Sequence, residues 1–101
     1  MSRREYELSP DARLDLALIW NYLAEHASID VADRIINDIE SAIPTLVGSP
    51  HLGHRRTDLA GPEFLFHRVH SYFVVYHATL EPLRVIRILH MSRNVKRILG
   101  E

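Results

Sequence analysis

The sequence predicts an α+β fold in which a short strand and two helices precede three strands and a short terminal helix. Two observations support this order, β-α-α-β-β-β. Apolar residues recur at helical spacing in the first half of the chain, and the last third holds three runs rich in aromatic and β-branched residues. Because only short breaks separate those runs, we expect them to form an antiparallel meander.

The first expected helix has a clear start signal. A strand candidate at residues 5–8 precedes it. Ser9 is suited to cap the helix, Pro10 to its first turn and Asp11 to its positive N-terminal end. We therefore expect a helix over residues 10–25.

This first helix is expected to be amphipathic. The apolar stripe that we expect to be buried comprises Ala12, Leu16, Ile19, Trp20 and Leu23. Trp20 lies within this stripe, so we expect it to anchor the core. Asp11, Asp15 and Tyr22 are expected on other faces of the helix.

A second helix is expected directly afterwards, capped by Ser28 and with Asp30 in its first turn. Its connection to the first helix is so short that the two should form an antiparallel hairpin. Pro44 removes a backbone donor, so we expect a kink or an early stop around residues 42–45, and residues 48–50 end the helix in any case. The buried stripe is expected to comprise Ala32, Ile35, Ile36, Ile39, Ile43 and Leu46.

The three strands are expected at residues 64–69, 72–78 and 83–90, and residues 94–99 are expected to form a turn of helix. Residues 51–62 form a loop that is long for so small a chain, and it holds the adjacent pair Arg55 and Arg56.

Length and composition place limits on the function. With 101 residues, 47% of them hydrophobic and 25% charged, we expect a single globular domain over residues 1–101. No apolar run approaches the roughly 20 residues that a membrane span needs, so we expect a cytoplasmic protein without membrane contact. The chain has no cysteine, which excludes disulfides, thiolate zinc sites and cysteine nucleophiles.

The seven histidines do not predict a metal site. His67 and His70 are three apart on or beside a strand and should point to opposite faces, and His51 and His54 have no obvious third ligand. We therefore expect neither a metal nor a cofactor.

The net charge of −1 conceals two halves of opposite sign. Residues 1–47 hold nine carboxylates and four arginines, whereas residues 48–101 hold eight cations and four carboxylates. A basic half suggests an acidic partner, either nucleic acid or a carboxylate-rich protein surface. The alternative is that the two halves neutralise each other across the fold.

Several motifs in fixed order resemble one known family. They are Leu8-Ser9-Pro10, Ile19-Trp20-x-Tyr22, Ser49-Pro50-x-Leu52-Gly53, Val69-x-x-Tyr72-x-Val74-x-Tyr76 and Val85-x-Arg87-Ile88-Leu89-His90-x-x-Arg93. Together they resemble the ParE branch of the ParE/RelE toxins of bacterial type II toxin–antitoxin pairs. The resemblance implies a helical hairpin packed on a curved antiparallel sheet. It also implies growth inhibition by poisoning of DNA gyrase, and a cognate antitoxin that neutralises the toxin in a hetero-oligomer.

The same superfamily contains ribosome-dependent mRNA endonucleases of the RelE type. Nucleases that resemble this chain place an arginine at the position of Phe73, and often a tyrosine at the position of Arg97. Both differences remove groups that RNA cleavage uses, a phosphate clamp and a proton-transfer group. We therefore expect a binding inhibitor. The endonuclease and an inactive antitoxin-binding module are the alternatives.

The residues expected to contact the target are Arg55, Arg56, His90 and Arg93. His90 and Arg93 would be the catalytic pair if the chain were a nuclease. Each also has a structural interpretation: the two loop arginines are solvated, His90 satisfies a carbonyl or a carboxylate, and Arg93 caps the sheet edge or pairs with Glu101. Arg87 is expected to pair with a helix carboxylate.

Overall fold

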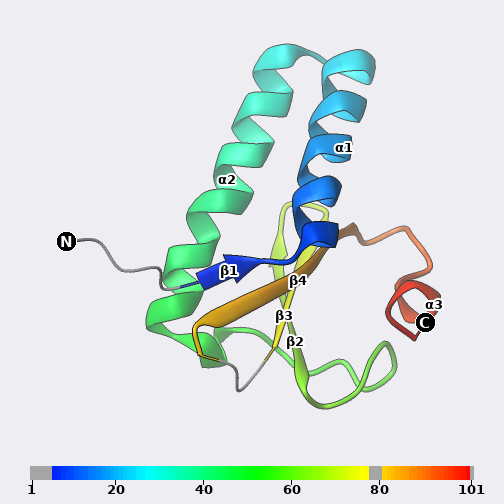
Figure 1. Cartoon of the computed structure of the whole chain (residues 1–101). Helices are drawn as coiled ribbons and strands as arrows, with labels where there is room; N and C mark the ends of the chain where they lie inside the picture. The colour runs from blue at the N-terminus through cyan, green and yellow to red at the C-terminus, as the bar shows by residue number, and fades with distance from the viewer. Residues whose placement is uncertain (1–5, 78–80, 101) are drawn as a thin grey trace.

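The computed structural model of the chain describes residues 6–77 and 81–100 and confirms the predicted α+β fold (Figure 1). The helices are α1 (Pro10–His26), α2 (Ile29–Gly48), the short 3-10 helix η1 (Pro50–Leu52) and α3 (Val95–Gly100). The strands are β1 (Tyr6–Leu8), β2 (Phe64–Val69), β3 (Tyr72–His77) and β4 (Leu83–His90). Glu5 and Ala78, which the sequence analysis assigned to strands, lie outside the described residues.

The strands form one sheet in the order β1-β4-β3-β2. The meander of β2, β3 and β4 is antiparallel, as predicted, and Val69 lies opposite Tyr72 at the β2–β3 turn. The N-terminal strand β1 joins the sheet in parallel with β4, and Tyr6 lies opposite Leu83. Chain order alone does not indicate this pairing, because both long helices and strands β2 and β3 lie between β1 and β4 in the sequence.

A β-bulge interrupts β4 between the two halves of its pairing with β3. Tyr76 lies opposite Val85 and Val75 lies opposite Arg87, so Ile86 has no partner on β3. An extra residue reverses the alternation of side chains across the sheet. Val85 and Ile88 are three residues apart, yet both belong to the cluster that packs against the helices.

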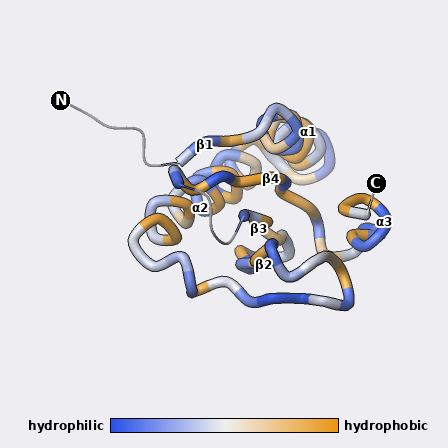
Figure 2. The backbone as a smooth tube through the Cα atoms, turned by 60° about the horizontal axis from the view of Figure 1, so that its bottom comes forward, coloured by the Kyte–Doolittle hydropathy of each residue, from blue (hydrophilic) through white to orange (hydrophobic). Residues whose placement is uncertain are grey.

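The sheet carries a core on each of its faces. The cluster under α1 and α2 is centred on Ile39, Ile43, Leu46, Val74 and Tyr76, all at most 1% exposed. The other cluster comprises Phe66, Phe73, Val75, Leu89 and Val95. Figure 2 shows the helical pair on one side of the strands, and the loop before β2 together with α3 on the other side.

Two expectations about the faces of α1 are wrong. Asp15, which was expected on an outer face, is only 5% exposed and lies against β4. Trp20, which was expected in the core, is partly buried and stands outside both core clusters. Its indole N–H donates a hydrogen bond to the Asp33 carboxylate on α2 over 2.8 Å, so it links the two helices at their surface.

Helix α2 continues past Pro44 and ends at Gly48, so the expected early stop is wrong. Pro44 is exposed, and so is Glu40, whose carbonyl loses its helical partner there. Water can therefore solvate the free carbonyl. Burial of Ile43 and Leu46 on the opposite side keeps the last turns on the sheet.

Candidate functional site

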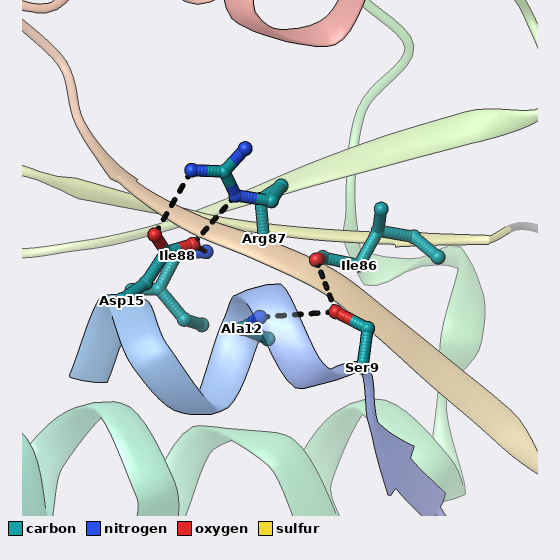
Figure 3. Close-up of polar contacts among 6 residues, drawn as sticks. All are labelled: Ser9, Ala12, Asp15, Ile86, Arg87 and Ile88. Atoms are coloured by element: carbon teal, nitrogen blue, oxygen red, sulfur yellow. Dashed lines mark hydrogen bonds and ion pairs between the residues drawn. The ribbon is translucent and has the colours of Figure 1, made fainter. Parts of the chain in front are cut away.

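Polar contacts with Ser9 and Asp15 attach α1 to β4. Ser9 caps the helix through the Ala12 N–H, and its own hydroxyl donates to the carbonyl of the bulged residue Ile86 over 2.6 Å (Figure 3). Asp15 accepts three hydrogen bonds, two from the Arg87 guanidinium at 2.8 and 3.0 Å and one from the Ile88 N–H at 2.9 Å. The predicted pairing of Arg87 with a helix carboxylate is thereby confirmed, and the hydrogen bond with Asp15 raises the pKa of Arg87.

Beside this attachment lies an open pocket of about 440 Å³ between residues 15–22 of α1 and the end of β4. Its lining residues are Asp15, Leu18, Ile19, Tyr22, Tyr72, Ile88, His90, Ser92 and Arg93. Ile88 and His90 are two residues apart, so they share a face of the strand. The bulge therefore determines that the His90 side chain faces α1 and not the opposite layer.

His90 is held in one tautomer by Ser92, two residues beyond the end of its strand. The Ser92 backbone N–H donates to Nδ1 of His90 over 3.0 Å, and the Ser92 hydroxyl lies 2.7 Å from the same nitrogen. An atom that accepts a backbone N–H cannot carry a proton, so neutral His90 has its proton on Nε2. His90 therefore has an N–H to donate and no free lone pair with which to remove a proton.

Tyr72 lies edge-on to His90, with ring centroids 5.0 Å apart. Burial raises the pKa of Tyr72, and the neighbouring Tyr22 adds to the rise, so the phenol stays protonated near neutral pH. Arg93, the other expected contact in this pocket, is exposed and makes no ion pair within residues 6–77 and 81–100. Its other expected partner, Glu101, lies outside the described residues.

Arg55 and Arg56 do not join His90 and Arg93 in this pocket. The Arg55 guanidinium donates to the Pro62 carbonyl over 2.9 Å, within the loop. Arg56 pairs with Asp58 through two hydrogen bonds of 3.0 and 2.9 Å and lies 5.8 Å from the centre of the Phe73 ring. The ring belongs to the core on the other face of the sheet. The four predicted contacts thus divide between two places.

The wall that α1 contributes to the pocket was not predicted from the sequence. Leu18 and Tyr22 line the pocket, and Leu14, one turn earlier on α1, continues the same exposed row outside it. Leu14, Leu18 and Tyr22 are 56%, 56% and 59% exposed, and they follow one another at intervals of four residues. Such spacing places them on one face, so α1 has a second apolar stripe beside its buried one. That repeat was present in the sequence. Tyr72 could not have been found in the same way, because its side chain reaches the pocket only through the folded sheet.

Comparison with known proteins identifies the family. Residues 6–95 match the family model described as the ParE toxin of the type II toxin–antitoxin system, parDE. The chain belongs to the ParE toxin family. It is 31% identical to Toxin ParE1 of Mycobacterium tuberculosis (strain ATCC 25618 / H37Rv) over 98 residues, which cover 96% of this chain and 98% of that relative. Toxin ParE1 of Caulobacter vibrioides is 28% identical over 98 residues.

A solved structure supports the same fold. The chromosomal ParDE toxin–antitoxin system from P. aeruginosa contains a chain that superimposes with a TM-score of 0.74 at 15% identity, covering 86% of this chain and 95% of that one. The ParE fold and the expected family are thereby confirmed. None of the described helices is long and apolar enough to cross a membrane.

Proposed function

We propose that this ParE-family chain inhibits growth by binding DNA gyrase and that it carries out no covalent step itself. The observation that supports a binding role most strongly concerns the side chains that line the pocket beside α1: His90, Tyr72 and Asp15 are not disposed to act as a general base. RNA cleavage through a 2′-hydroxyl needs a general base as well as an acid. His90 accepts two contacts at Nδ1 and presents N–H at Nε2, Tyr72 remains a neutral phenol, and the Asp15 carboxylate is occupied by Arg87.

The position of Phe73 points in the same direction. Its ring is 9% exposed and packs against Phe66 on the face of the sheet opposite His90, with ring centroids 5.4 Å apart. A side chain in this place contributes to a core and does not bind phosphate. Arg56, which lies over the ring, is engaged by Asp58.

We propose further that a cognate antitoxin covers the apolar stripe of Leu14, Leu18 and Tyr22 on α1. More than half of each of these side chains is exposed, and an exposed apolar row along one helix is typical of a protein interface. An amphipathic segment of a partner would bury this row by docking along α1. Leu18→Glu should then weaken the complex strongly, whereas Leu52→Glu, on η1, serves as a control at another exposed leucine.

The gyrase hypothesis is tested by expressing the chain alone in a bacterial host with a DNA-damage reporter, followed by a supercoiling assay with purified protein and gyrase. We expect growth arrest with the reporter on, and loss of supercoiling that increases with toxin concentration. Arrest with a silent reporter and intact supercoiling would contradict the proposal.

A second candidate is the ribosome-dependent endonuclease, because His90 and Arg93 do meet in one pocket. His90→Ala separates the two functions. A nuclease whose acid is His90 should lose cleavage of ribosome-bound mRNA by a factor of about 10²–10⁴. A binding inhibitor should lose only part of its affinity for gyrase.

A further inference from the structure

The pocket between α1 and β4 combines apolar walls with hydrogen-bond donors. Leu18, Ile19 and Ile88 supply aliphatic surface, and Tyr72 closes the side next to His90. A volume of about 440 Å³ lies within the range of about 300–1,000 Å³ typical of ligand pockets. The walls therefore suit an apolar group that enters from solvent.

The polar groups of the pocket are predominantly donors. His90 offers Nε2–H because Ser92 occupies its Nδ1 through both the backbone N–H and the hydroxyl. Arg93 offers a guanidinium that makes no ion pair within the described part of the chain. These two residues lie at the end of β4, beside the apolar walls.

The only carboxylate in the lining does not oppose an anionic ligand. Asp15 is buried, and its two oxygens accept hydrogen bonds from Arg87 and from the Ile88 N–H. Its charge is thereby balanced within the fold. The pocket is left with one uncompensated positive charge, on Arg93.

One positive charge fits a single carboxylate better than a nucleic-acid strand. A phosphate backbone is held by several cations acting together. Arg55 and Arg56, the other candidate cations, are bound to Pro62 and Asp58 elsewhere. The chemistry therefore favours one acidic side chain with an apolar side chain next to it.

We propose that this pocket is a receptor for an acidic, apolar segment of a protein partner, in which the apolar side chain enters between α1 and β4 and the neighbouring carboxylate binds Arg93 and His90 Nε2–H. Ser92 is the positioning residue, because it holds His90 as a donor. The inference rests on the proposed function, in which the chain acts by binding, and it names the chemistry that the site recognises.

The test measures binding of two matched probes to the full chain by NMR of uniformly ¹⁵N-labelled protein. The probes are acetyl-Phe-Glu-amide and acetyl-Phe-Gln-amide, which differ in charge but hardly in size. We expect the Glu probe to shift the signals of His90 and Arg93 and to bind about tenfold more tightly than the Gln probe, as a charge-assisted hydrogen bond implies. Long-range ¹H–¹⁵N spectra should show the His90 proton on Nε2.

Variants link the affinity to particular residues. Arg93→Gln should reduce binding of the Glu probe to the level of the Gln probe, and Arg55→Gln should leave it unchanged. Ser92→Ala should weaken binding by roughly twofold to fivefold, because it removes the hydroxyl that holds the His90 ring in place, while the backbone N–H at Nδ1 remains. Equal affinities of the two probes, no binding of the Glu probe, or equal effects of Arg93→Gln and Arg55→Gln would overturn the inference. Binding of inorganic phosphate to the same residues as tightly as the Glu probe would also overturn it.

Neither probe contains gyrase or antitoxin, so this result is independent of the supercoiling assay. Intact supercoiling together with selective binding of the Glu probe refutes only the gyrase proposal. Inhibited supercoiling together with unselective probes refutes only the carboxylate receptor.

Discussion

Substitution of Asp15 by asparagine should be among the most destabilising isosteric changes in this chain. The Asp15 side chain is 6% exposed and accepts three hydrogen bonds, two of them from Arg87, whose side chain is 21% exposed. Removing one member of a buried ion pair typically costs about 3–5 kcal/mol, because the other charge stays buried without its partner. Arg87 retains some contact with water, so we expect a loss of about 2–4 kcal/mol in the free energy of unfolding.

The assay is urea denaturation of the purified chain, compared with thermal unfolding. For a chain of this size, a loss of about 3 kcal/mol lowers the unfolding temperature by roughly 12–24 °C. Glu25→Gln is the matched control, because the Glu25 carboxylate is on the same helix and its side chain is 79% exposed. The control should stay within about 0.5 kcal/mol of the wild type. A loss below about 1 kcal/mol for Asp15→Asn would refute the assignment of Asp15 as the attachment of α1 to the sheet.

Three further predictions concern the buried tyrosines and the glycines. Tyr76→Phe should lower the free energy of unfolding by about 1–3 kcal/mol, because the Tyr76 hydroxyl donates to the Pro50 carbonyl and accepts the Gly53 N–H over 2.9 Å. Urea denaturation that shows no loss would contradict those contacts. Gly53→Ala should lower the free energy of unfolding by about 1–3 kcal/mol in the same assay, because a Cβ there would lie 2.9 Å from two carbons of the Tyr76 ring. Gly48→Ala is the control: a Cβ at that position has no atom within 4 Å, so the change should be neutral or stabilising. Burial raises the pKa of both Tyr76 and Tyr72 above 10.0, so the fold favours the neutral phenols, and stability present below about pH 10 should be lost as the pH rises beyond it. Denaturation between pH 8 and 11 checks the sign, and a free energy of unfolding that does not fall above pH 10 would count against it.

The elements themselves followed from local patterns. Ser9 and Ser28 cap α1 and α2 as expected, and the runs at 64–69 and 83–90 became strands with the expected bounds. Capping and side-chain alternation act between residues a few positions apart, so a single sequence reveals them. The outcome at Pro44 depended instead on which side of α2 faced solvent.

The candidate site was only partly predictable. His90 and Arg93 were selected from the end of an apolar strand, and both line the pocket. The α1 wall was not predicted, although the repeat of Leu14, Leu18 and Tyr22 was visible and Tyr22 was expected outside the core. Exposed apolar residues are common on protein surfaces, so such a repeat does not by itself indicate a pocket. Separation of the loop arginines from His90 by the sheet could not be read from the charge pattern.

By itself the sequence determined the order of elements, the buried stripe of α2, the antiparallel meander and the residues at the end of β4. These features depend on local periodicity and short connections. Only the tertiary structure decided that β1 pairs with β4, that Asp15 is buried against Arg87, and that the extra residue at Ile86 places His90 beside α1. The first two depend on contacts between residues more than 70 positions apart, and the third depends on the exact register of β4 against β3, neither of which a local pattern records.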